Sequence, residues 1–204
     1  MRHDGRGPAA ALGLSPGWLA LCLVGGGQDG ADLAEAFVEA ELPPDTNGLL
    51  VTGPCMPAAV RRRLIRSVAS NPCRRVVWFV HEPTRLVRRA DRVVATGGYN
   101  TVYEILSFEK PALIVPRVTP RQEQLIRAER LRALGLVDVL HPEGLSAAAL
   151  SAWLARGRAP VRPARERIDF NGLSRVPQLL EELLGSRPPL GPRRRVRAQV
   201  YDAA

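Results

Sequence analysis

The stretch ADRVVATGGYNTVYEILSFEKPALIVPR, residues 90–117, decides the fold. It runs from the apolar segment 92–96 through Gly97-Gly98 into an amphipathic segment, and then into a second apolar segment at 112–116. Short apolar runs that do not alternate with polar residues are typical of fully buried strands, and helical periodicity between two of them predicts a strand–helix–strand unit. Two consecutive glycines between strand and helix indicate that something approaches the backbone closely, and they permit positive φ angles.

The same unit recurs along the chain. Its regular repetition predicts an α/β fold, a doubly wound parallel sheet in a single Rossmann-like domain, because consecutive βα units cross over with one hand. In such a sheet ligands bind beyond the carboxyl ends of the strands, where the glycine-rich loops gather. We expect buried strands at 19–24, 48–52, 75–80, 92–96, 112–116 and 137–140, and helices at 30–41, 57–70, from 83, from 100, at 120–134 and at 146–155.

Composition changes mark four regions of the chain. We expect an N-terminal tail at 1–17, the Rossmann-like domain at 18–155, a linker and C-terminal helix at 156–185, and a basic, disordered tail at 186–204. The helix at 172–185 has one apolar face, formed by Val176, Leu179, Leu180, Leu183 and Leu184. An apolar helix face without a partner is a candidate interface, for another subunit or for self-association.

The positive charge of the chain is concentrated in its last quarter. The formal net charge is +9, but residues 18–154 hold 16 basic and 14 acidic residues, whereas residues 155–204 hold 11 and 5. No aromatic residues interleave with the basic ones, which disfavours a nucleic-acid partner. Contact with an anionic membrane surface is left open only for the basic tail or through a partner.

The cysteines and histidines do not form a metal or disulfide pattern. Three cysteines, an odd number with no CxxC pair, favour a reducing compartment, and no two histidines have metal-ligand spacing. No apolar run approaches the length of a membrane span. The sequence therefore predicts a cytoplasmic protein without a protein-held metal. The cysteines and histidines considered are Cys22, Cys55, Cys73, His3, His81 and His141.

The first glycine-rich loop, GGGQDG at 25–30, matches the dinucleotide fingerprint G-x-G-x-x-G after a predicted strand. That fingerprint needs an acidic residue at the end of the next strand to hold a ribose, and this chain has Thr52-Gly53-Pro54 there. A redox role with NAD is therefore disfavoured. Two readings stay open: a tight turn that eases helix packing, or a loop whose amides face an anion.

The second glycine-rich loop, TGGYNTVYE at 96–104, predicts an anion site. Asn100 and Thr101 are natural helix caps, and the free N–H groups of a helix start attract phosphate with the help of the macrodipole. Glu104 either caps this turn or accepts hydrogen bonds from two sugar hydroxyls. A third segment, VPRVTPRQEQ at 115–124, brings Arg117, Glu123 and Gln124 to the same edge of the sheet.

These motifs together resemble a known family. GGGQDG, F-V-x₉-A-D-x-V-V at 79–94, GGYNTVYEI and PRQEQ are similar to the C-terminal, nucleotide-sugar-binding half of GT-B glycosyltransferases of family 28, over residues 19–155. That family includes the transferase that adds N-acetylglucosamine to the lipid-linked peptidoglycan precursor. With the loops above, the resemblance implies a nucleotide-sugar site of Gly26, Gly27, Val80, Gly97, Gly98, Asn100, Thr101, Glu104, Arg117, Glu123 and Gln124.

The resemblance also implies a role for several of these residues. Thr101 would contact phosphate, Glu104 the ribose hydroxyls, and Val80 the uracil through its backbone, while Glu123 and Gln124 would contact the donor sugar. The chain departs from the family pattern at Gly27, where the family has a small hydroxyl residue, and at Asn100, where an apolar residue is common.

We therefore expect the donor domain of a hexosyltransferase that moves an N-acetylglucosaminyl-like group from a UDP-sugar to an unknown acceptor. No cofactor or metal ion is expected, because backbone amides and a helix dipole would hold the diphosphate. The acceptor and catalytic base belong to an N-terminal half in this family, so a partner half or subunit is expected, as in the split eukaryotic N-acetylglucosaminyltransferase. The alternatives are a catalytically silent nucleotide-binding or assembly module and a GT-B-fold nucleotide-sugar 2-epimerase.

Overall fold

The computed structural model describes residues 12–156 and 163–185. The chain divides into two compact units, Met1–Arg167 and Ile168–Ala204, each of which is described by itself. The basic tail expected at 186–204 lies outside the described residues, as do residues 1–11 and 157–162.

The first unit is built on one six-stranded sheet in which every neighbouring pair of strands is parallel. The strand order is β3-β2-β1-β4-β5-β6, which confirms the doubly wound sheet expected from the alternating apolar and amphipathic segments. β1, β2 and β3 are added toward one edge of the sheet, whereas β4, β5 and β6 are added toward the other. The change of direction between β1 and β4 opens a crevice at the carboxyl ends of the strands. The strands are β1 Trp18–Leu23, β2 Thr46–Val51, β3 Arg74–Val77, β4 Arg92–Ala95, β5 Ala112–Ile114 and β6 Asp138–Val139.

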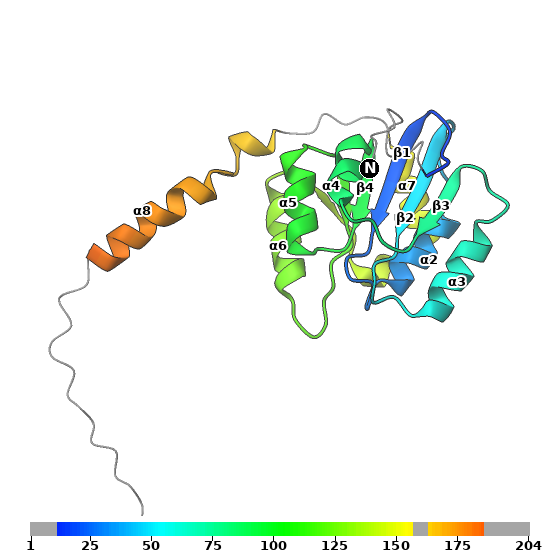
Figure 1. Ribbon diagram of the computed structural model, residues 1–204, viewed down its shortest axis with the longest axis horizontal. Helices are drawn as coiled ribbons and strands as arrows, with labels where there is room; N and C mark the ends of the chain where they lie inside the picture. The colour runs from blue at the N-terminus through cyan, green and yellow to red at the C-terminus, as the bar shows by residue number, and fades with distance from the viewer. Residues whose placement is uncertain (1–11, 157–162, 186–204) are drawn as a thin grey trace, which may run out of the picture. The chain divides into compact units, whose positions relative to one another are not determined.

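Helices cover both faces of the sheet (Figure 1). On one face of the sheet α2 packs against α3 and α7. On the other face α4 packs against α5, and α6 lies beside α5 (Figure 1). The helices of this unit are α2 Ala31–Glu39, α3 Ala58–Ser67, α4 Pro83–Arg89, α5 Tyr99–Ser107, α6 Glu123–Ala133 and α7 Ala147–Leu154, with short 3₁₀ turns η1 Pro142–Gly144 and η2 Ala164–Glu166.

The core has two layers because successive strand residues point to opposite faces of the sheet. Cys22 and Leu50 pack with Phe37, Leu150 and Trp153 in the layer under α2 and α7. Burial raises the pKa of the Cys22 thiol well above its usual range, as expected for a small core residue.

A buried arginine ties the edge strand β3 to α2. Arg74 is 9% exposed, and its guanidinium donates to the carbonyl oxygens of Phe37, at 3.0 Å, and Ala40. These carbonyls belong to the last turn of α2, where a positive charge also complements the helix dipole. Burial lowers the pKa of Arg74.

Several elements differ from the expected boundaries, among them β3, α3 and α6. β3 ends at Val77, the last residue paired with β2, instead of reaching Val80, and Trp78 and Phe79 are 54% and 56% exposed. As an edge strand, β3 has one neighbour and less reason to continue. Pro57 is the N-cap of α3 rather than its first residue, and α6 begins at Glu123, three residues later than expected.

The first unit extends beyond the boundaries 18–155 on both sides. Leu14 is 5% exposed, and Asn47 donates to the carbonyl oxygen of Ser15 at 3.0 Å. Ala164, in η2, is 1% exposed. Residues 12–17 and 163–167 are therefore part of this unit.

The second unit contains α8, Gly172–Gly185, whose bounds are those expected from its apolar face. Pro177 lies inside this helix. Among the described residues, no helix has both the length and the apolarity needed to cross a membrane.

Candidate functional site

A cavity of about 450 Å³ lies at the carboxyl edge of the sheet. The loops that follow β1, β4 and β5 all contribute to its wall, so it occupies the crevice expected where the strand order reverses. Of the residues predicted to form the site, five line this cavity. They are Gly26, Gly27, Gly98, Arg117 and Gln124.

The other predicted site residues are not part of the cavity wall. Gly97 packs against Gln124. The remaining five lie in α5, at the start of α6 and in the segment that follows β3. They are Val80, Asn100, Thr101, Glu104 and Glu123.

The first glycine-rich loop is locked against the loop that follows β2. Gly27 has φ +88°, and a Cβ there would lie 2.1 Å from the carbonyl oxygen of Thr52. The amide of Cys55 donates to the carbonyl oxygen of Gly26 at 2.7 Å. A side chain at Gly27 would therefore clash with the backbone, so the hydroxyl missing from this position has no room here.

The start of α2 already carries negative charge. Asp32 lies in its first turn, and Asp29 precedes its N-cap, Gly30. Carboxylates at a helix start interact favourably with the macrodipole and compete with any other anion. The amides at the start of α2 are thus the poorer of two candidate phosphate sites.

The start of α5 has neither a side-chain cap nor an acidic residue. Its N-cap is Gly98, no side chain caps it, and its first turn contains no carboxylate. The expectation that Asn100 and Thr101 are caps is wrong, because they are the second and third residues of the helix. The amides of this first turn remain available to a ligand.

Gly97 and Gly98 serve different purposes, and neither has the positive φ that the sequence permitted. A Cβ at Gly97 would lie 2.9 Å from the Cβ of Gln124, so this glycine lets α6 approach the loop. A Cβ at Gly98 would meet no atom within 4 Å. Gly98 lies at the cavity wall, where the open space leaves the backbone accessible.

Glu104 is the sixth residue of α5, too far along the helix to cap it. Its Oε1 accepts a hydrogen bond from Thr84 Oγ1, at 2.9 Å, across the α4–α5 contact. The capping alternative for Glu104 is therefore wrong. Its carboxylate is half-buried and held in place by a neighbouring hydroxyl, with lone pairs left for further donors.

Arg117 reaches across the cavity to the first loop. Its Nη1 lies 3.0 Å from Asp29 Oδ2, and its backbone N–H donates to Gln124 Oε1 at 3.1 Å. Its Nε is buried and has no hydrogen-bond partner among the described residues. Asp29 was not predicted as a site residue, although the sequence shows it as the one acidic residue inside GGGQDG.

Arg127 is a further residue that the sequence did not single out. Its Nη2 donates to the carbonyl oxygen of Gly97 at 2.6 Å, and its guanidinium lies over the ring of Tyr99. Tyr99 stacks at 4.5 Å on Tyr103, one helical turn away, and a hydrogen bond with Tyr99 raises the pKa of Tyr103. Arg127 follows Gln124 by three residues, so α6 holds the second glycine-rich loop at two points.

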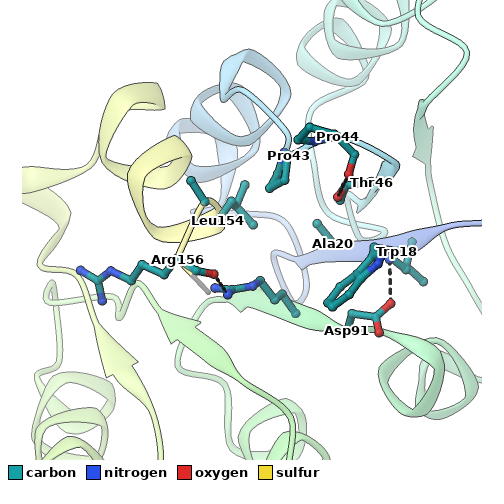
Figure 2. Close-up of a pocket in the computed structure, with 11 residues that line it drawn as sticks. Trp18, Ala20, Pro43, Pro44, Thr46, Asp91, Leu154 and Arg156 are labelled. Carbon is teal, nitrogen blue, oxygen red and sulfur yellow. Dashed lines mark hydrogen bonds between the residues drawn. The ribbon is translucent and has the colours of Figure 1, made fainter. Parts of the chain in front are cut away.

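A second, smaller hollow of about 190 Å³ lies at the opposite, amino-terminal edge of the sheet. Figure 2 shows Trp18, Pro43, Pro44 and Leu154 around it. Its polar side chains hold the backbone together: Asp91 accepts from the amide of Leu19 at 2.9 Å, and Arg92 donates to carbonyl oxygens at the end of α7. We assign the candidate site to the carboxyl edge, where the loops gather.

Among the described residues, no group of three or more histidine, cysteine, aspartate or glutamate side chains is arranged to hold a metal ion. The positive features of the carboxyl-edge cavity are the uncapped start of α5 and the guanidinium of Arg117. Doubly wound sheets bind their ligands at this switch point, and these two features suit an anionic group.

The chain belongs to glycosyltransferase family 28: residues 21–176 match the C-terminal domain of that family. It is 32% identical over 134 residues to the UDP-N-acetylglucosamine–N-acetylmuramyl-(pentapeptide) pyrophosphoryl-undecaprenol N-acetylglucosamine transferase of Streptococcus sanguinis, covering 63% of this chain and 35% of that enzyme. The enzyme of the same name from Geobacillus kaustophilus is 34% identical over 77 residues, which are 37% of this chain and 22% of the enzyme. The chain thus spans about a third or less of these curated relatives.

Solved structures confirm the GT-B half-fold. CalG4, the calicheamicin glycosyltransferase, matches 83% of this chain with 44% of its own, at a TM-score of 0.62 and 20% identity. MurG from Acinetobacter baumannii matches 82% of this chain with 54% of its own, at 0.61 and 20% identity. A putative UDP-N-acetylglucosamine 2-epimerase from Listeria monocytogenes matches at 0.54 and 13% identity, over 92% of this chain and 50% of its own. At these identities the likeness concerns the fold alone.

Proposed function

We propose that this chain is the donor-binding half of a hexosyltransferase that uses a UDP-sugar, with an N-acetylglucosaminyl-like group as the sugar transferred. The acceptor and the catalytic base would be supplied by an N-terminal half or a partner subunit. The proposal needs no metal ion or cofactor, because a helix start and a guanidinium supply positive charge for the diphosphate.

The observation that carries the proposal is the start of α5. Its amides are uncapped and free of acidic neighbours, and its N-cap, Gly98, lies at the wall of the cavity. Glu104, one turn further along the same helix, is a carboxylate suited to a pair of sugar hydroxyls. An anion site followed by a diol site is what a nucleoside diphosphate requires.

The remaining residues fit the other parts of the donor. The backbone of Val80 would meet the uracil, beside the exposed ring of Phe79, which offers a flat surface to a base. Glu123 and Gln124 would hold the hydroxyls of the sugar. The 32% identity to an N-acetylglucosamine transferase supports the choice of donor.

The proposed chemistry is displacement at the anomeric carbon. The bond between that carbon and the diphosphate oxygen breaks, a bond to an acceptor oxygen forms, and the acceptor's proton passes to a base outside this chain. The charge that develops on the leaving diphosphate would be stabilised by the amides of Asn100 and Thr101 and by Arg117.

Calorimetry with the isolated chain tests the proposal. UDP should bind more tightly than NAD⁺, and more tightly than ADP, because the base contact is specific for a pyrimidine. Equal affinity for UDP and NAD⁺ would contradict the donor assignment. Epimerisation of UDP-N-acetylglucosamine by the chain alone would replace it with the 2-epimerase alternative.

A further inference from the structure

The cavity has an unexpected charge for a site that takes a diphosphate. Of its lining residues, all within the described part of the chain, three are charged: Asp29, Asp32 and Arg117. Two carboxylates against one guanidinium give the wall a net negative charge, which opposes the binding of an anion. The presence of each carboxylate therefore requires a reason.

The presence of Asp32 is explained by the stability of α2. It is the second residue of α2, and a carboxylate in the first turn stabilises a helix through the macrodipole. Asp29 lies outside the helix, before the N-cap, and its side chain is 54% exposed. Its contact is with Arg117, from the far side of the cavity, 88 residues away along the chain.

The contacts that hold the Arg117 side chain are ones that a ligand can replace. Asp29 engages Nη1 at 3.0 Å, while the buried Nε has no partner among the described residues. A buried donor left unpaired is unfavourable, and an ion pair exposed to this extent is weak. A phosphate group offers the guanidinium a bidentate partner, which is a stronger one.

We propose that Asp29 is a competing carboxylate for Arg117. It holds the guanidinium across the cavity and competes with the ligand's phosphates for it, which lowers the affinity for the nucleoside diphosphate and favours its release after transfer. This inference rests on the proposed function, since it takes UDP as the product that leaves the cavity.

The test compares UDP and uridine binding by the wild-type chain and by Asp29→Asn, with Asp32→Asn as the matched control. Both variants remove one negative charge from the cavity wall, but only Asp29 pairs with Arg117. Asp29→Asn should bind UDP about fivefold more tightly, the equivalent of a well-formed exposed ion pair. Asp32→Asn should give a clearly smaller gain, and uridine binding should not change in either variant.

Repeating the comparison in Arg117→Gln completes a double-mutant cycle between Asp29 and Arg117. UDP binding should weaken in Arg117→Gln, and adding Asp29→Asn should then give no fivefold gain, because the competed group is absent. Equal gains from Asp29→Asn and Asp32→Asn would overturn the inference in favour of a general field effect. Weaker UDP binding by Asp29→Asn would overturn it in favour of a carboxylate that orients Arg117.

The failures of the two proposals are distinguishable. If the wild-type chain binds UDP no better than uridine, the proposed function fails and the inference fails with it. If UDP binds better than uridine but Asp29→Asn gives no gain, the inference alone fails.

Discussion

The hydrogen bond from Thr84 determines the orientation of the Glu104 carboxylate. Thr84 Oγ1 donates to Glu104 Oε1 at 2.9 Å, so one oxygen already has a protein partner. A carboxylate has about four lone-pair sites, and those that remain are enough for two sugar hydroxyls. A side chain fixed in this way loses little entropy on binding a ligand, which favours its use in recognition.

Glu104→Gln tests this role at the level of one atom. The variant keeps the shape of the side chain but removes its charge, so hydrogen bonds from the ribose hydroxyls to a charged acceptor are lost. We expect UDP binding to weaken by roughly 1.5–3 kcal/mol. The loss should be smaller for 2′-deoxy-UDP, which has one hydroxyl fewer, and calorimetry with both ligands measures the difference.

Thr84→Val provides the control for that experiment. It leaves the charge of Glu104 in place and removes only the hydroxyl that orients it, so UDP binding should fall by less than in Glu104→Gln. Equal losses of UDP and 2′-deoxy-UDP binding in Glu104→Gln would assign Glu104 a structural role instead.

At the scale of elements, two helices begin at the same cavity, one with an acidic first turn and one with an uncharged first turn. α2 has Asp32 in its first turn, whereas α5 has no acidic residue there and no side-chain cap. Natural helix starts favour carboxylates, so an uncapped and uncharged start has an unmet preference for an anion. The difference supports the proposal that the phosphates bind at α5.

Asn100→Asp tests that assignment through two effects of opposite sign. An added carboxylate in the first turn of α5 should stabilise the fold by about 0.3–1 kcal/mol. The same charge should weaken UDP binding at least fivefold, because like charges a few ångströms apart repel by ~1–4 kcal/mol. Thermal unfolding and calorimetry measure the two effects on the same protein.

Asn71→Asp is the matched control for Asn100→Asp. Asn71 precedes β3 at the amino-terminal edge of the sheet, and the amide of Cys73 donates to its Oδ1, which an aspartate oxygen can replace. The same change of charge at this distance should leave UDP binding unaffected. Unchanged UDP binding in Asn100→Asp would remove α5 from the phosphate site.

The sequence predicted the sheet well and its edge poorly. Central strands such as β1 are buried on both faces, so their apolar runs identify them without knowledge of the fold. β3 lies at the edge, and its run of apolar residues continues through Trp78 and Phe79 after pairing has stopped. Apolar character alone does not distinguish a paired residue from one exposed at a loop.

The candidate site was predictable in its loops but not in its contacts. The glycine-rich segments lie in motifs with a recognisable spacing, and glycines from both of them line the cavity. The pair of Asp29 and Arg117 depends on the proximity of segments 88 residues apart, and no local pattern encodes that. The same holds for Arg127 in α6, whose partner Gly97 lies in the loop between β4 and α5.

For the whole molecule, the cavity belongs to the first unit alone. All of its lining residues lie between Val24 and Leu145, well inside Met1–Arg167. A chain that ends after Arg167 should therefore bind UDP within about twofold of the full chain, since no lining residue is removed. A chain that ends after Ala155 also lacks Ala164, which is 1% exposed, and should unfold at a lower temperature.

Calorimetry and thermal unfolding of the two shortened chains check this prediction. Transfer to an acceptor, where a partner half is supplied, should be lost in both, because α8 and its apolar face are absent from each. A large loss of UDP affinity in the chain that ends after Arg167 would show that the second unit contributes to the donor site.

The interlock of Gly27 with Thr52 restricts how this loop can change. In this chain the backbone leaves no room for a side chain at Gly27, so a substitution there would be eliminated by misfolding before it could alter substrate choice. Gln28 and Asp29, the next two residues, are exposed at the cavity and free of that restriction. Evolution of donor preference at this loop should therefore be concentrated in these two adjacent codons.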